Sequence, residues 1–105
     1  MDAINAIPAF WKTSGAAQRL VVSALKSITL GPNEHGVWIQ TRGQNVYVTM
    51  DGSTPVIGGN DLGFEIRTTD APVRLEGAPG TKFSFMPVTG TAIIQYQMLT
   101  LSGRN

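Results

Sequence analysis

The single histidine is the first residue to test for catalytic chemistry. His35 stands between Asn33 and Gly36, among residue types that favour a turn. In a Ser-His-Asp triad it would act as the base, beside a serine of the kind presented by a Gly-x-Ser-x-Gly turn. The sequence contains no such turn. We therefore interpret His35 as a loop residue, expect no catalytic residues and predict that the chain is not an enzyme.

The stretch from Glu76 to Lys82 reads Glu-Gly-Ala-Pro-Gly-Thr-Lys and has the glycines and the lysine of a phosphate-binding loop. In a working loop the lysine directly precedes the Ser or Thr, so that both side chains reach phosphate and metal. Here Lys82 follows Thr81. Pro79-Gly80 instead predicts a type II turn, because proline fixes its own φ and glycine accepts the positive φ of the next position.

Asp51, Asn60 and Asp61 carry side-chain oxygens of the kind that calcium binds. Their spacing is not that of a calcium-binding loop, and Asp and Asn are also preferred turn residues. The chain has no cysteine, so a thiolate metal site is excluded. We expect no metal site and no cofactor.

Four aromatic residues, Trp11, Trp38, Tyr47 and Tyr96, could form a stacking platform for sugars or bases. Trp38 and Tyr47 lie in two strand-like runs separated by Gly43-Gln44, a link with the glycine that a type II′ hairpin turn prefers. Each lies on the face opposite to the alternating apolar residues of its run, which are Val37 and Ile39 in the first run and Val46 and Val48 in the second. If these runs pair, Trp38 and Tyr47 become neighbours and a possible ligand-stacking site. The alternative is that both side chains pack in the core on the second face of a sandwich strand.

From Arg19 onward, runs rich in Val, Ile, Thr, Phe and Tyr recur between Gly, Pro, Asn and Asp, which is typical of an all-β sandwich or barrel. The predicted strands are residues 19–23, 27–30, 37–42, 45–50, 62–68, 73–76, 82–87 and 92–100. We therefore predict one small antiparallel β-sandwich over residues 19–105.

The last of these runs is the longest and is unbroken by Gly or Pro. Its residues alternate between two faces, with Ile93, Gln95, Gln97 and Leu99 on one of them. A long apolar strand without proline is expected in the middle of a sheet, where both of its edges are paired.

Residues 1–18 lack a clean strand pattern and contain four large apolar side chains, Ile4, Ile7, Phe10 and Trp11. Burial of four side chains does not offset the backbone entropy lost on ordering the segment. It should therefore order only where its backbone also pairs, on its own sheet edge or on a neighbour's. We predict an extended N-terminal arm whose four apolar residues bind a partner. The alternative is an amphipathic helix, which the proline in this segment opposes.

Composition limits the partners. Charged residues make up 14% of the 105 residues, well below the roughly 25% of an average soluble domain, and the net charge is +1. The eight basic residues are scattered, so we expect no nucleic-acid binding, which needs several phosphates neutralised together. No apolar run is long enough to predict a membrane segment, and the N-terminus lacks the basic start of a signal peptide. We expect a protein that is made in the cytoplasm.

Three segments carry a resemblance to a known group of proteins. They are residues 44–56 (Gln-Asn-Val-Tyr-Val-Thr-Met-Asp-Gly-Ser-Thr-Pro-Val), residues 58–63 (Gly-Gly-Asn-Asp-Leu-Gly) and residues 71–81 (Ala-Pro-Val-Arg-Leu-Glu-Gly-Ala-Pro-Gly-Thr). This pattern, a strand, then Asp-Gly-Ser/Thr-x-Pro, then a glycine turn into a second hairpin, resembles small virion proteins of tailed bacteriophages. The Asp-Gly start and the proline exit make a compact turn, which gives the pattern a structural reason.

The resemblance implies a capsid decoration or cement protein of jelly-roll-like architecture, located on the capsid surface of the virion. Its implied partner is the major capsid protein, and its implied assembly is a homo-oligomer, with a trimer favoured. A tail or fibre module that binds a host-surface glycan, and a head-tail connector or baseplate component, remain the alternatives.

Overall fold

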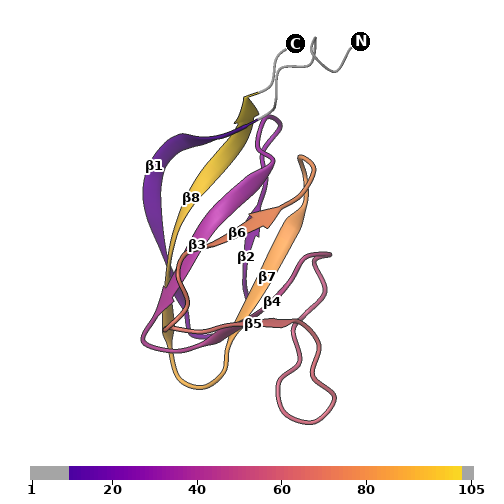
Figure 1. Ribbon diagram of the computed structural model, residues 1–105. Coiled ribbons are helices and arrows are strands. Elements are labelled where there is room, and N and C mark those ends of the chain that lie inside the picture. Colours follow the sequence, from indigo (N-terminus) through magenta and orange to yellow (C-terminus); the bar gives the residue numbers. More distant parts are fainter. Residues whose placement is uncertain (1–9, 103–105) are drawn as a thin grey trace.

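The computed structural model describes residues 10–102 and consists of strands and loops, with no helix among these residues (Figure 1). The strands are β1 (Phe10–Val22), β2 (Lys26–Thr29), β3 (Gly36–Arg42), β4 (Val46–Thr49), β5 (Phe64–Ile66), β6 (Val73–Glu76), β7 (Lys82–Pro87) and β8 (Ala92–Ser102). The predicted all-β class is confirmed. Each predicted strand is present, and those at 73–76 and 82–87 have the predicted bounds.

The strands form two antiparallel sheets of four, in the orders β1-β8-β3-β6 and β2-β7-β4-β5. The pairing is nested: β1 pairs with β8, β2 with β7, β3 with β6 and β4 with β5. The contacts β3 with β8 and β4 with β7 then complete each sheet. The chain thus runs as one long hairpin rolled into two layers, and the predicted antiparallel sandwich is confirmed.

The core lies between the two sheets because each inner strand turns alternate apolar residues toward the other layer. Strand β3 buries Val37 and Ile39, β4 buries Val46 and Val48, and β7 contributes two phenylalanines with no exposed surface. The remaining buried apolar residues are Val22, Ile28, Leu30, Ile66, Leu75, Ala92, Ile94 and Leu99. The period of two in the sequence therefore identified the buried face of these strands.

Strand β8 lies between β1 and β3, so the prediction of a central C-terminal strand is confirmed. Its neighbours use both of its edges over nearly its whole length, from Ala92 paired with Val22 to Leu99 paired with Gly36. A strand without glycine or proline can offer an unbroken series of donors and acceptors to two partners, which explains its place.

The predicted hairpin around Gly43-Gln44 is wrong. Strands β3 and β4 belong to different sheets, and this link carries the chain from one layer to the other. Gly43 has a φ of +82°, and the buried Thr41 hydroxyl donates to the Gln44 carbonyl over 2.8 Å. Gly43 has the positive φ that the prediction gave it, but turn chemistry does not choose the partner of a strand. The apolar faces of β3 and β4 therefore meet across the core, since the two strands lie in different layers.

The predicted boundary between arm and sandwich at residue 18 is also wrong. Strand β1 begins at Phe10 and pairs with β8 along its length, with a register shift between Ser14 and Gln18 where Gly15 has a φ of +80°. Backbone pairing on the chain's own sheet edge supplies the order that side-chain burial alone does not. It also rules out a helix for residues 10–18. Residues 1–9, with Ile4 and Ile7, lie outside the described residues.

Candidate binding surfaces

The outer face of the sheet β1-β8-β3-β6 carries the first candidate surface. Trp38 alternates with the buried Val37 and Ile39, points away from the core and is 37% exposed. Its cross-strand neighbours are Gln97 of β8 and Arg74 of β6. We call the outward residues Trp38, Gln40, Arg42, Arg74, Gln95 and Gln97 the Trp38 face.

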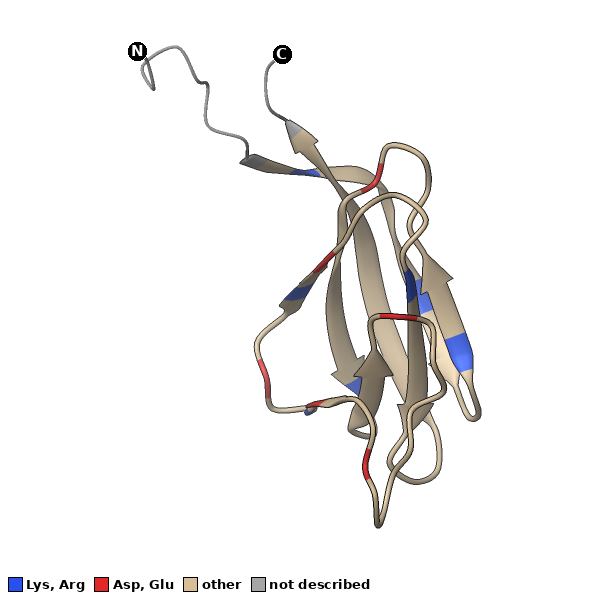
Figure 2. Cartoon of the chain, turned by 90° about the vertical axis from the view of Figure 1, so that its right-hand side faces the viewer, with Lys and Arg blue, Asp and Glu red and all other residues tan. Residues whose placement is uncertain are grey.

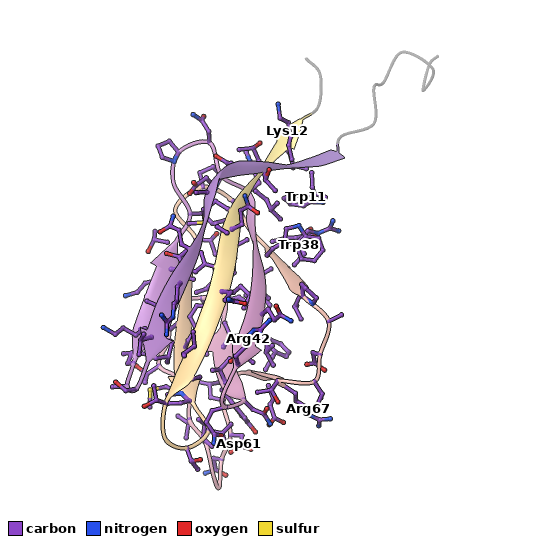
Figure 3. The ribbon with its side chains drawn as sticks, turned by 90° about the vertical axis from the view of Figure 1, so that its left-hand side faces the viewer. Trp11, Lys12, Trp38, Arg42, Asp61 and Arg67 are labelled. Atoms are coloured by element: carbon purple, nitrogen blue, oxygen red, sulfur yellow. The ribbon has the colours of Figure 1, made fainter. Side chains whose placement is uncertain are left out.

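Trp11 packs at the upper border of this face (Figure 3). Its ring lies against Gly36, and a Cβ added at Gly36 would be 2.9 Å from Trp11 Cζ3. The same Cβ would be 2.9 Å from the Leu75 carbonyl oxygen. The Arg74 guanidinium carbon lies 4.7 Å from the centre of the Trp11 ring, a cation–π contact, and Arg74 Nε is also 3.0 Å from Glu76 Oε2. The charge of Arg74 is therefore engaged within the chain.

Hydrogen bonds hold two glutamine amides of the Trp38 face. Arg42 Nε donates to Gln95 Oε1 over 3.1 Å, and Gln97 Nε2 donates to the Gly15 carbonyl over 2.9 Å. Gln40 lies directly opposite Gln95 in the sheet. These amides surround an apolar hollow of about 170 Å³ beside Trp38. The arrangement offers one aromatic surface with several oriented, uncharged polar groups.

Tyr47 lies on β4, in the other sheet, so the structure does not bring Trp38 and Tyr47 together and the proposed stacking pair is wrong. Because β3 and β4 face each other across the core, the outward side chains of the two strands lie on opposite sides of the sandwich. The Tyr47 hydroxyl donates to Asp61 Oδ2 over 3.0 Å. This hydrogen bond, with burial and the charge of Asp61, raises the pKa of the Tyr47 phenol above its ordinary value.

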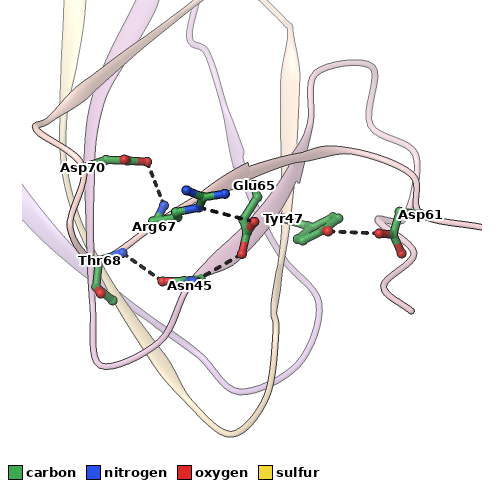
Figure 4. Close-up of polar contacts among 7 residues, drawn as sticks. All are labelled: Asn45, Tyr47, Asp61, Glu65, Arg67, Thr68 and Asp70. Atoms are coloured by element: carbon green, nitrogen blue, oxygen red, sulfur yellow. Dashed lines mark hydrogen bonds and ion pairs between the residues drawn. The ribbon is translucent and has the colours of Figure 1, made fainter. Parts of the chain in front are cut away.

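A polar network continues from Tyr47 toward β5 and fastens the neighbouring loop (Figure 4). Asn45 Nδ2 donates to Glu65 Oε2 over 3.2 Å, and the Asn45 side-chain oxygen accepts from the Thr68 amide over 2.9 Å. Arg67 Nε lies 3.6 Å from Glu65 Oε1, and its backbone amide donates to Asp70. These exposed contacts have a structural role, since they join Glu65 of β5 to Asn45 and Arg67 beside the strands and fasten the turn that follows β5.

The second candidate surface is an apolar patch that sequence reasoning missed. Met50, Val56, Leu62 and Phe64 are 40%, 43%, 47% and 65% exposed. Met50, Leu62 and Phe64 line one open hollow of about 360 Å³, and backbone hydrogen bonds join Val56 to Leu62. We call these four residues the β4–β5 patch. The sequence contained a signal, because Leu62 and Phe64 alternate with Gly63 in a predicted strand, but it did not indicate that their side chains are exposed.

Of the three residues tested for calcium, Asp51 and Asp61 serve separate turns. Asp51 Oδ1 accepts from the Ser53 amide over 3.0 Å and from the Ser53 hydroxyl over 2.6 Å, and these bonds hold the pKa of Asp51 below its ordinary value. Asp61 Oδ1 accepts from the Gly58 amide over 2.6 Å. Within residues 10–102, no three His, Cys, Asp or Glu side chains are grouped as a metal site would require.

His35 and Pro79-Gly80 lie close to strand ends. The His35 amide donates to the Leu99 carbonyl and its carbonyl accepts from Gly77, each over 2.9 Å, so its backbone links β8 to the end of β6. The Thr81 amide donates to the Ala78 carbonyl over 3.0 Å, and Gly80 has a φ of +91°, which confirms the predicted turn.

Charges are few and are divided between strands and loops (Figure 2). Most of the described basic residues lie in strands, whereas Glu34, Asp51, Asp61 and Asp70 lie in loops. The Trp38 face contains two arginines and no carboxylate, whereas Asp51 lines the hollow of the β4–β5 patch. No helix able to cross a membrane is present in the described part of the chain.

Comparisons of the chain with protein-family models, with curated proteins and with solved structures found no match.

Proposed function

We propose that this chain is a bacteriophage virion structural protein, a capsid decoration or cement protein that bridges and stabilises neighbouring major capsid subunits. The resemblance of residues 44–81 to small phage virion proteins motivates the proposal. The observation that carries it is the β4–β5 patch, whose four apolar residues are 40–65% exposed, and three of these residues line one hollow.

A contiguous apolar patch of this kind favours a protein-binding role. Exposed apolar patches rimmed by polar residues mark interaction sites, and charged residues are depleted from the centres of interfaces. Phe64 lies on β5, an edge strand of its sheet, with Asp51 and Ser53 at the border of the hollow. A large aromatic side chain at such a position is the type of residue that carries most of the binding energy of an interface.

The positions of the patch and of the first residues of β1 suit a bridging role. Strand β1 begins at one end of the sandwich, and the loop between β4 and β5 lies at the other end (Figure 1). We assign Ile4, Ile7 and Phe10 to a second contact, with an adjacent subunit. One molecule could then hold two neighbours, which is the action of a cement protein.

The winding of the strands supports the same proposal. We infer a jelly roll, an architecture found in viral capsid and lectin domains, and the nested pairing of β1 with β8 through β4 with β5 supports this inference. We extend the proposal to a homo-oligomer, a trimer, on the capsid surface. The oligomeric state follows from the resemblance and is tested by light scattering of the purified protein.

Binding of the purified protein to phage heads (assembled capsids) that lack it tests the proposal. We expect the wild type to bind, and Leu62→Ser with Phe64→Ser to weaken attachment by about tenfold or more, as loss of an interface hot spot does. Val21→Ser is the matched control, because Val21 is 48% exposed on the opposite sheet. Exposed substitutions of this kind change stability by only about 0.5 kcal/mol, so folding is not the variable. Equal attachment of the wild type, the double variant and Val21→Ser would refute a role of the β4–β5 patch in binding to the capsid.

A deletion shorter than the predicted arm of residues 1–18 tests whether the N-terminal segment binds a capsid subunit. Removing residues 1–18 would delete most of β1, so the deletion must stop at residue 9. We expect the shortened protein to keep its melting temperature and to attach less tightly to heads. Undiminished attachment would contradict the assignment of Ile4 and Ile7 to the interface.

Copy number separates this proposal from the alternatives. Decoration requires a number of copies comparable with that of the major capsid protein, measured by quantitative mass spectrometry of purified particles. A connector, baseplate or fibre component would be present in a small fixed number, and that result would refute decoration.

A further inference from the structure

The Trp38 face has the properties of a ligand site that the virion proposal does not use. The hollow beside Trp38 measures about 170 Å³, smaller than the roughly 300–1,000 Å³ of pockets that enclose drug-sized ligands. Its lining includes Ala17, Trp38, Gln40, Pro72, Gln95 and Gln97. The space therefore suits one small ring that lies against the sheet.

We propose that this hollow binds a pyranose ring of a saccharide, with Trp38 stacked on the apolar face of the ring and Gln40, Gln95 and Gln97 hydrogen-bonded to its hydroxyls. The C–H groups of a pyranose face carry partial positive charge, and the face of an indole ring carries the negative part of its quadrupole. Stacking on Trp38 thus has both an apolar and an electrostatic component.

The glutamines supply the polar half of the recognition. Each amide has donors and acceptors, as a sugar hydroxyl does, so one amide can serve either role of a hydroxyl group. The bonds from Arg42 to Gln95 and from Gln97 to the Gly15 carbonyl fix two of these amides before a ligand arrives. Groups that are already held lose less conformational entropy on binding.

The charges of this face favour a saccharide over a nucleic acid. Arg74 is engaged by Glu76 and by the Trp11 ring, so the remaining cation of this face is Arg42, which is bonded to the neutral Gln95 amide. Binding of single-stranded nucleic acid needs a positively charged groove as well as stacking. The uncharged amides around Trp38 match hydroxyl groups better.

The inference does not depend on the chain's place in a virion. Binding of the full chain to an array of immobilised oligosaccharides, neutral hexose oligomers and uronate- or sialate-containing ones, tests it. We expect retention of at least one class, and a loss of about tenfold or more with Trp38→Ala. Tyr47→Phe is the matched control, because Tyr47 lies on the opposite sheet. No retention on the array, or retention that Trp38→Ala leaves unchanged, would overturn the proposal.

Titration of the ¹⁵N-labelled protein with the best-retained oligosaccharide keeps the test independent of folding. The two tryptophans give two indole N–H signals, and we expect the Trp38 signal to move more than that of Trp11. Gln95→Ala should weaken binding while both indole signals keep their positions in the free protein. A larger shift at Trp11, or an oligonucleotide that competes for the site, would overturn the assignment. Attachment of Trp38→Ala to heads should be unchanged, so failure here leaves the virion proposal standing.

Discussion

Replacing Trp11 with alanine tests whether the first residues of β1 are a structural part of the sheet. The Trp11 ring is partly buried, covers Gly36 and holds the Arg74 guanidinium at 4.7 Å from its centre. In a free arm the same substitution would cost no stability. The two interpretations of this segment therefore predict different melting temperatures for one variant.

The expected loss follows from two contributions. Truncation of a fully buried Phe or Trp to alanine costs about 3–5 kcal/mol, and roughly half of that applies to a partly exposed ring. The cation–π contact with Arg74 adds about 0.5–1 kcal/mol at an exposed site. A total of about 2–3.5 kcal/mol lowers the melting temperature of a domain of this size by roughly 8–28 °C.

Thermal unfolding followed by circular dichroism measures this loss. Val21→Ala is the control, because Val21 lies on the same strand but is 48% exposed, and we expect its melting temperature to stay near that of the wild type. An unchanged melting temperature for Trp11→Ala would refute the packing of this end of β1.

Gly36→Ala provides an independent check of the same contact. A Cβ at Gly36 would lie 2.9 Å from the Trp11 ring, and the resulting overpacking should cost about 1–3 kcal/mol. With Trp11 already alanine, part of this clash disappears. The double variant should therefore be more stable than the sum of the two losses predicts, by about 0.5 kcal/mol or more. Strict additivity would contradict the position of the ring.

Three further predictions follow from other parts of the sandwich. In a Tyr96→Phe background, the absorbance of Tyr47 at 295 nm should titrate above the ordinary tyrosine range, because Asp61 raises the pKa of Tyr47. Asp61→Asn should lower the midpoint of this titration. An equal midpoint in the two proteins would exclude the hydrogen bond between Tyr47 and Asp61. The pKa of Tyr47 is higher in the folded protein than in the unfolded chain. The hydrogen bond to Asp61 therefore contributes to stability below the ordinary tyrosine pKa of 10.0, and this contribution is lost as pH rises through the pKa of the folded protein. Phe85→Ala, at a side chain with no exposed surface, should cost about 3–5 kcal/mol in urea unfolding, and a loss below 1 kcal/mol would contradict its burial. Gly63→Ala should lower the free energy of unfolding by about 1–3 kcal/mol, because Gly63 has a φ of +120° and a Cβ there would be 3.0 Å from the Val48 carbonyl oxygen. An unchanged midpoint of urea unfolding would argue against this backbone conformation.

Part of the candidate saccharide site could be predicted from the sequence. The alternation in β8 placed Gln95 and Gln97 on one face, and the alternation in β3 set Trp38 opposite to Val37 and Ile39. What the alternation did not supply was the neighbour of each strand. Gln97 lies beside Trp38 only because β8 pairs with β3, and these strands are separated by about half of the chain.

The sequence by itself determined the order and approximate position of the strands, and the buried faces of β3 and β4, because alternation with a period of two and turn residues such as Pro79-Gly80 act over a few residues. The tertiary structure decided the partner of each strand. Thus β3 and β4 entered different sheets, Tyr47 was separated from Trp38, and residues 10–18 became part of a strand. The physical reason is that pairing depends on which apolar faces close on one another and which edges remain open. These are properties of distant segments together, and no local pattern encodes them.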